Sequence, residues 1–278
     1  MRITIKDNKI EFTAREVSAI SSVNLSFSAL EFDGIKTAVG SIEWNGKKYL
    51  VGKEAVLRGL PELPKQNEFI KTILPLFVLK YGNKFDRIHV LISPRDWHLK
   101  KELIDILSFA KGEVKVYPQG IGPWILAGCP KDCIVFDIGF RTVEVIVVSS
   151  WVIRRDLSFA LETGIGSFAG KIVADTPFNI AEGFIKKDSR FERIKRDYWI
   201  YLFNQLDSVR IFKDVYNHSI PVILSGGGAY LHEFIPDNIK PKKIKVIKNP
   251  EFANINGLIK LLKQQEVKNE KVHQNNPS

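Results

Sequence analysis

The chain has 278 residues, of which 45% are hydrophobic and 26% are charged, enough for a sizeable core in one large domain or two of ordinary size. No apolar stretch approaches the roughly 20 residues that span a bilayer, and the N-terminus lacks the apolar segment of a secretory signal. We therefore expect no membrane association and a cytoplasmic location. Cys129 and Cys133 stand alone as a Cys-x3-Cys pair, which favours free thiols over a zinc site.

The net charge is 41 − 31 = +10, and much of the excess lies near the C-terminus. From Lys240 onward there are nine Lys and three Glu, which gives +6. Such a region can attract an acidic partner or nucleic acid. Phe252 is the only aromatic residue in it, so base stacking has no support, and direct DNA contact is a weaker interpretation than a solvated lysine face.

The first half of the chain begins with hairpins and then alternates helices and strands. Residues 2–12 alternate in polarity, and residues 35–51 do so around Asn45-Gly46, the strongest short hairpin pattern. The segments that follow predict α/β alternation. In order these are a short helix at 53–58, a loop at 59–66, a helix from Asn67, a strand at 87–93, a helix at 97–110 and a strand at 114–117.

Residues 131–150 are the most informative stretch of the sequence, because two buried-type strands there flank a chemically distinctive turn. Gly139 can take backbone angles that let amides surround an anion. Asp137, at the end of a buried strand, suits a hydrated magnesium ion. Thr142 can donate its hydroxyl to a phosphate. An ordinary hairpin with a turn-type Asp-Ile-Gly is the alternative, and these residues alone do not separate the two.

The second half contains two more glycine turns that come directly after strands. The turn at 163–166 leads into a helix through Val173, and the turn at 225–229 follows a buried strand. Glycines there let the backbone approach a flat ligand, and the helix start beyond favours an anion. The other expected elements are a strand at 151–157, an excursion at 177–190, a helix at 191–216, a strand at 221–224, a helix at 230–234, a strand at 244–247, a helix at 252–262 and a disordered tail at 264–278.

Taken together, these segments resemble the actin-like ATPase superfamily, and most of all the ParM-type plasmid-segregation actins and their archaeal relatives. The resemblance is carried in chain order by Tyr49–Gly52, Tyr117–Gly122, Ile134–Val145, Thr163–Gly166, Leu224–Ala229 and Asn249–Gly257. It implies an α/β, ribonuclease H-like fold of two domains with a nucleotide cleft between them. The expected domains are 1–127 and 128–263, followed by the tail at 264–278.

The resemblance also implies roles for particular residues, with ATP and Mg²⁺ as cofactors. Asp137 would hold the magnesium through water, and Gln119 would position the attacking water; Gln119 as a plain helix-start residue stays open. Glu182 and Lys186 would line the adenine pocket unless they are ordinary surface residues. The remaining nucleotide contacts would come from Gly139, Arg141 and Thr142 at the phosphates, Gly164 and Gly166 beside the nucleotide, and Gly226, Gly227 and Gly228 beneath the adenosine.

Two features depart from the family pattern. Val143-Glu144 stands where relatives have Thr-Asp, so Thr142 serves the turn alone. Met1–Phe12 resembles the strand that follows the family's first phosphate loop, and the loop itself is not found. Either the start codon has been placed too late, or the protein lacks that strand and loop.

The leading functional hypothesis is an ATP-binding, ATP-hydrolysing protein that forms filaments by self-association, with plasmid DNA segregation as its setting. In such proteins a separate DNA-bound adaptor makes the DNA contact. The alternatives are a degenerate actin-like scaffold with weak or no nucleotide hydrolysis, and a small-molecule kinase of the same superfamily.

Overall fold

The computed structural model describes residues 2–6, 9–14, 20–23, 42–51, 71, 74–79, 86–169, 191–207 and 220–275, which fall into two compact units. Unit 1 comprises Met1–Val90 and His98–Val116, and unit 2 comprises Leu91–Trp97 and Tyr117–Ser278. Residues 117–127, assigned to the first domain from sequence, thus belong to the second unit, because helix α5 (Ile121–Leu126) packs against α10 (Ala253–Asn275).

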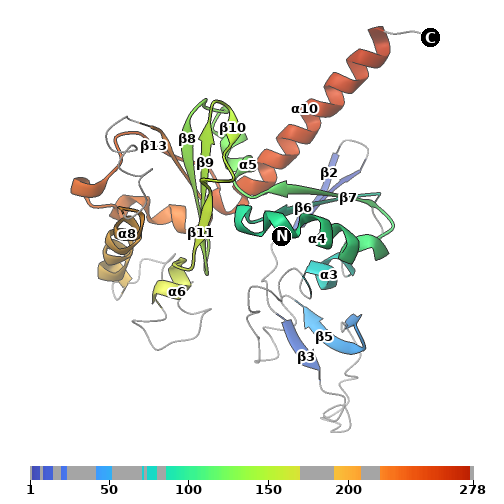
Figure 1. Cartoon of the computed structure of the whole chain (residues 1–278), viewed down its shortest axis with the longest axis horizontal. Helices are drawn as coiled ribbons and strands as arrows, with labels where there is room; N and C mark the ends of the chain where they lie inside the picture. The colour runs from blue at the N-terminus through green and yellow to red at the C-terminus, as the bar shows by residue number, and fades with distance from the viewer. Residues whose placement is uncertain are drawn as a thin grey trace. The chain divides into compact units, whose positions relative to one another are not determined.

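Unit 1 starts with the two hairpins that the sequence predicts (Figure 1). Strands β1 (Arg2–Lys6) and β2 (Lys9–Ala14) pair antiparallel, and β4 (Ile42–Trp44) pairs with β5 (Lys47–Val51). The second turn has φ +50° at Asn45 and +71° at Gly46, the left-handed geometry that Asn-Gly favours. Strand β3 (Ile20–Val23) completes a three-stranded sheet in the order β3-β5-β4.

The segment that follows alternates helices and strands, as the sequence predicts. It contains α3 (Leu74–Phe77), β6 (Arg87–Ile92), η4 (Pro94–Leu99), α4 (Lys100–Ile106), η5 (Leu107–Phe109) and β7 (Glu113–Pro118). The helix expected at 97–110 begins earlier, at Pro94, because proline is well suited to a first helical turn. The helix at 53–58, the loop at 59–66 and the start of the helix at Asn67 lie outside the described residues.

Unit 2 is built on a mixed sheet in the order β10-β9-β8-β12-β13, with β11 also paired to β9. The predicted central hairpin is confirmed as β8 (Cys133–Ile138) and β9 (Val143–Ser149), while β12 (Val222–Ser225) runs parallel to both β8 and β13 (Ile244–Val246). The strand expected at 151–157 reduces to β10 (Val152–Ile153), because Ser150 and Trp151 form a turn at positive φ. Strand β11 (Phe159–Leu161) follows.

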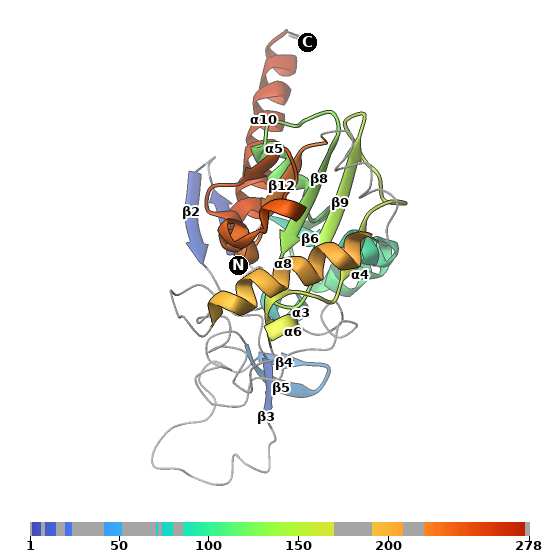
Figure 2. The same cartoon turned by 90° about the vertical axis from the view of Figure 1, so that its left-hand side faces the viewer.

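Helices cover both faces of this sheet (Figure 1). Alternate strand residues such as Phe136 and Val145 pack with α6 (Ile165–Ala169), α8 (Glu192–Asp207) and η7 (Gly227–Phe234). The residues between them, such as Val135 and Ile146, pack with α5 and α10. Figure 2 looks onto the first of these faces, with α8 in front of the strands. Both faces of β8 and β9 are therefore buried, which explains their continuous apolar runs.

The last helix differs most from its prediction. Helix α10 continues to Asn275 instead of ending at Leu262, so residues 264–275, expected to be disordered, are helical. No Gly or Pro stands between Leu258 and Asn276, and Lys, Glu and Gln are good helix formers, so nothing stops the helix before Pro277.

Shorter elements complete unit 2. The 3-10 helices η8 (Asp237–Ile239) and η9 (Pro250–Phe252) flank β13, and η7 starts at Gly227 rather than Tyr230. The excursion at 177–190 and the predicted helical residues 208–216 lie outside the described residues. In the part of the chain that the structure describes, no helix is both long and apolar enough to span a membrane.

Candidate functional site

A row of polar side chains crosses the sheet of unit 2 where β8 and β12 end. Ser225 on β12 is the register partner of Asp137 on β8, and Asp137 is the partner of Glu144 on β9. Residues opposite each other in adjacent strands point to the same face of a sheet. By the alternation along each strand, this face is the one that α5 and α10 cover.

Asp137 is held by one neutral donor on each carboxylate oxygen. The Ser225 hydroxyl lies 3.3 Å from Oδ1 and also 3.3 Å from the Phe136 carbonyl oxygen, so the two acceptors share its one proton, and the Asn254 side-chain amide donates to Oδ2. Burial raises the pKa of Asp137, and the bonds from Asn254 and Ser225 oppose that rise because they favour the ionised form. The carboxylate is thus fixed in orientation and poor in water, a state that an arriving cation would stabilise.

Glu144 is also buried, with 5% of its surface exposed. The Ser93 hydroxyl donates to its Oε2 at 2.6 Å. Burial raises the pKa of Glu144 to about 7; the bond from Ser93 opposes the rise, and the neighbouring charge of Asp137 adds to it. Two adjacent acids therefore share this end of the sheet. The sequence showed Glu144 only as a departure from the family pattern, because its burial depends on strand β11 and Ser93, which lie elsewhere in the chain.

Asn254 connects Asp137 to the turn that follows β7. Its Oδ1 accepts the Gly120 amide at 2.7 Å, while its Nδ2 donates to Asp137. The preceding residue, Gln119, donates its own backbone amide to the Ile92 carbonyl at 2.7 Å. Asn254 was not among the predicted site residues. It lies inside the segment 249–257 that carried part of the resemblance, so this segment was the sequence feature that could have identified it.

Helices α5 and α10 meet through glycine. A Cβ atom on Gly122 would lie 2.2 Å from the Asn254 carbonyl oxygen, and one on Gly257 would lie 2.1 Å from the Gly122 carbonyl oxygen. Real Cβ atoms do not approach backbone so closely, so both positions require glycine. This contact brings the first turn of α10, with Asn254, beside Gly120.

The turn after β8 is joined to the start of α6 by backbone hydrogen bonds. The amides of Gly164 and Gly166 donate to the carbonyls of Arg141 and Phe140 at 2.9 and 2.7 Å, and the Gly139 amide donates to the Thr142 carbonyl at 2.8 Å. Predicted site residues Gly139, Arg141, Thr142, Gly164 and Gly166 are therefore brought together. Their glycine amides serve this packing in the structure, and contact with a phosphate stays a prediction.

The glycine turn after β12 passes directly over the end of β8. A Cβ atom on Gly226 (φ +76°) would lie 2.4 Å from the Ile138 carbonyl oxygen and 2.7 Å from Oδ1 of Asp137. One on Gly228 would lie 2.1 Å from Cγ2 of Ile138, whereas Gly227 has no neighbour within 4 Å. Gly226 and Gly228 thus allow the close crossing, and Gly227 leaves its outer side open.

The structure does not bear on every predicted position. Glu182 and Lys186 lie outside the described residues. No group of three or more His, Cys, Asp or Glu that could hold a metal occurs among the residues described. Metal binding at Asp137 stays a prediction.

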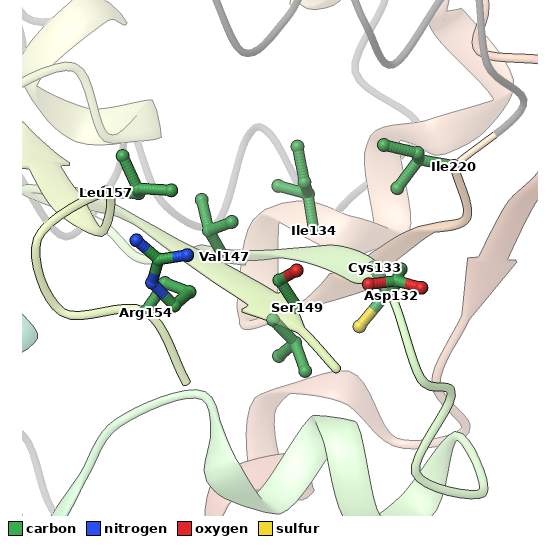
Figure 3. Close-up of a pocket in the computed structure, with 9 residues that line it drawn as sticks. Asp132, Cys133, Ile134, Val147, Ser149, Arg154, Leu157 and Ile220 are labelled. Carbon is green, nitrogen blue, oxygen red and sulfur yellow. The ribbon is translucent and has the colours of Figure 1, made fainter. Parts of the chain in front are cut away.

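A hollow of about 310 Å³ lies at the opposite end of β8 and β9 from Asp137. Figure 3 shows Ile134, Val147 and Leu157 around it, with Arg154 and Asp132 among the lining side chains. None of the predicted site residues that the structure describes lines it. Cys133, also in the lining, is unpaired like Cys129, and burial raises the pKa of its thiol to about 12, so it is a poor nucleophile.

Part of the basic region predicted from sequence lies along an edge of the sheet. Strand β13 is the last strand in the order, and five exposed lysines lie on it or beside it. These are Lys240, Lys242, Lys243, Lys245 and Lys248. Lys245 donates to the Ala127 carbonyl at 2.8 Å. Lysines on an edge strand discourage pairing with other strands, which is a sufficient reason for their presence.

No family model and no curated protein sequence matches the chain. Solved structures do. A non-polymerisable quadruple mutant of pCBH ParM has 18% identity and a TM-score of 0.62, covering 93% of this chain and 94% of that one. A 15-stranded ParM filament from Clostridium botulinum matches at 19% identity and a TM-score of 0.58, covering 93% of this chain and 94% of that one.

The archaeal actin homologue Ta0583 is also similar, at 17% identity and a TM-score of 0.58, with 93% and 94% of the two chains covered. A structure of Ta0583 in complex with ADP matches at 18% identity and a TM-score of 0.52, covering 79% of this chain and 87% of that one. These matches confirm that the chain has the α/β, actin-like fold that the motifs predicted, and that its fold is ParM-like.

Proposed function

We propose that this chain binds ATP with magnesium at the end of β8 and β12, hydrolyses it, and assembles into filaments. The observation that carries the proposal is the close approach of Gly226 to Asp137, a carboxylate already oriented by Ser225 and Asn254. A glycine turn lets a flat ligand reach the backbone, and the carboxylate beneath it suits a hydrated cation.

The nucleotide would lie along the open side of Gly227. The complex of Ta0583 with ADP supports an adenine nucleotide as the ligand. In this arrangement Gly226, Gly227 and Gly228 would run beneath the adenosine, and Glu182 and Lys186 would line the adenine. The exposed side chain of Arg141, with Thr142 and Gly139, would face the phosphates, and Gly164 and Gly166 would hold that turn in place.

Magnesium fits the acids present. Two neighbouring buried carboxyl groups, Asp137 and Glu144, have raised pKa values that a cation would lower again. When bound, the ion would neutralise charge on the phosphate oxygens. Asp137 would hold it through water, and Gln119 would orient the attacking water with its carboxamide.

Filament formation is supported by the likeness to a ParM filament. Plasmid DNA segregation would follow if a DNA-bound adaptor joins the filament to its cargo. The five lysines beside β13 have no aromatic partner among them, so we assign DNA contact to the adaptor.

The test is a titration with magnesium-ATP that compares the wild type with Asp137→Ala. We expect micromolar binding by the wild type and a loss of at least about tenfold in the variant, because the oriented carboxylate is removed. Asp156→Ala is the matched control, since Asp156 is exposed and pairs with Arg154. Equal binding by all three proteins would exclude this site. Sedimentation with and without ATP tests assembly, and the absence of pelleted protein under every nucleotide would refute the filament part.

One observation favours a second candidate, an actin-like scaffold that binds nucleotide weakly or not at all. The amides of Gly139, Gly164 and Gly166 all donate to backbone carbonyls, which leaves them unavailable to phosphate in this conformation. A well-folded wild type without measurable ATP binding would support this candidate and exclude the first.

A further inference from the structure

We infer that Asn254 is a positioning residue, which holds the turn carrying Gln119 at a fixed place relative to the Asp137 carboxylate. This inference rests on the proposed function for its consequences in catalysis, although its structural part can be tested without activity. The residues it joins are far apart in sequence: Asn254 is 134 residues from Gly120 and 117 from Asp137.

The two ends of the Asn254 amide group make opposite kinds of bond. The Gly120 N–H can only donate, so it requires the amide oxygen, and the Asp137 carboxylate accepts, so it requires the amide nitrogen. The two partners therefore fix the orientation of the amide. Aspartate would keep the acceptor and lose the donor, and alanine would lose both.

The two hydrogen bonds by which Asn254 joins Gly120 to Asp137 form a bridge, and its surroundings leave it little freedom. Gly120 has φ +82°, and a Cβ atom there would lie 2.5 Å from the Ile146 side chain, so the turn is confined. On the other side, the Asn254 backbone lies against Gly122 of α5. Both partners of the bridge are thus held on packed elements, which is what a precise positioning contact requires.

Loss of the bridge would loosen both the Asp137 carboxylate and the turn that carries Gln119. Among the described residues, the Ser225 hydroxyl is the side-chain donor that Asp137 would keep, and the Gly120 amide beside Gln119 would lose its acceptor. The glycine turn at 226–228 is not part of the bridge. Turnover should therefore fall more than nucleotide affinity.

The experiment measures the ATP dissociation constant and kcat for the wild type, Asn254→Ala and Asn254→Asp. Asn256→Ala is the control, because Asn256 is exposed on the same helix. For Asn254→Ala we expect kcat to fall about 10- to 100-fold, the usual cost of losing an orienting contact, with the dissociation constant within about threefold of wild type.

Asn254→Asp adds a readout that a merely structural role would not move. When its new carboxyl is protonated it can donate to Asp137 again, so the kcat of this variant relative to wild type should rise as the pH is lowered. The same ratio for Asn254→Ala should stay flat. A wild type that hydrolyses ATP together with an unchanged kcat in Asn254→Ala would overturn the inference and leave the proposed function standing.

Backbone amide exchange of Gly120 separates the inference from the proposed function. We expect Gly120 to exchange at least about tenfold faster in Asn254→Ala than in wild type and at the wild-type rate in Asn256→Ala, because the amide loses its acceptor. If the wild type neither binds nor hydrolyses ATP, the proposed function fails, and faster exchange would still support the bridge. Unchanged exchange would overturn the bridge in either case.

Discussion

The two faces of the sheet in unit 2 are built from alternate residues of the same strands, yet they differ in chemistry. The face under α8 is apolar along the full length of β8, from Ile134 through Ile138. The face under α5 and α10 is apolar at Cys133 and Val135 and ends in Asp137. A strand with period two can thus contribute to stability on one side and to a polar site on the other.

Aromatic rings fill the α8 face. Trp199 stacks on Phe203 with ring centroids 5.9 Å apart, and Phe203 meets Phe136 of the sheet edge-on at 6.4 Å. The indole N–H of Trp199 donates to the Leu231 carbonyl at 2.7 Å, so its polar atom is satisfied. This face gains free energy from the burial of its rings, although the Tyr198 hydroxyl is buried there without a hydrogen-bond partner among the described residues.

On the α10 face, the burial of Asp137 and Glu144 offsets part of the free energy gained from burying apolar residues. Burying a carboxyl group costs free energy unless it is hydrogen-bonded, and Ser225, Asn254 and Ser93 supply those bonds. The difference between the faces leads to predictions of different kinds: changes on the α8 face should alter stability alone, and changes on the α10 face should alter its pH dependence and the site.

The largest expected effect is on the α8 face. Trp199→Ala should lower the free energy of unfolding by about 3–5 kcal/mol, because it removes a fully buried ring and leaves a cavity. Urea unfolding followed by circular dichroism measures the loss. The neighbour Ile200, 39% exposed, provides Ile200→Ala as a control that should cost much less. A Trp199→Ala loss as small as that of the control would contradict the assignment of this face as the main core.

The next effect concerns pH on the α10 face. The pKa of Glu144 rises from 4.5 to about 7 on folding, so between these values the folded chain keeps a proton that the unfolded chain releases. Stability contributed by this group is therefore greatest below pH 4.5 and is lost as the pH rises to about 7. Glu144→Gln removes this titration, so its free energy of unfolding relative to wild type should increase by about 3 kcal/mol across that window.

Urea unfolding with EDTA, at intervals across this window, measures the pH effect. Glu162→Gln is the control, because the side chain of Glu162 is 74% exposed, and its difference from wild type should change little with pH. If Glu144→Gln differs from wild type by a constant amount at every pH, Glu144 ionises normally in the folded protein.

The sequence predicted this architecture where the pattern is local. The hairpin at Asn45-Gly46 and the pair β8 and β9 follow from turn chemistry and apolar runs, and both are confirmed. The predicted length of α10 was wrong. A polar stretch without apolar periodicity suggests disorder, although it contains no residue that would end a helix. The predicted length of β10 was too great, because nothing in the sequence indicates that Trp151 takes a positive φ and forms a turn.

The site was predictable only in part, for a related reason. Asp137 and the glycines at 226–228 stand at strand ends, where a motif reveals them, and the structure places Gly226 next to Asp137, while their role in nucleotide binding stays a prediction. Glu144 and Asn254 gain their significance from partners on other elements: Ser93 is 51 residues away from Glu144, and Gly120 is 134 from Asn254. Distances of this kind follow from the register of the sheet and the packing of α5, which no local pattern contains.

The smallest of the three effects tests how the α10 face is assembled. Gly122→Ala should lower the free energy of unfolding by about 2 kcal/mol, because the new Cβ would meet the backbone of Asn254 and force α5 and α10 apart. Gly227→Ala is the matched control: the site there has negative φ and no atom within 4 Å, so the same methyl group should cost little. Chemical denaturation of both variants measures the difference.

Because Gly122→Ala pushes α10 from α5, it should also speed the exchange of the Gly120 amide, which Gly227→Ala should leave unchanged. Equal stability of the two variants would mean that α5 and α10 can separate without cost. The α10 face would then be a looser structure than the α8 face, and the acids at its end would owe their burial to the strands alone.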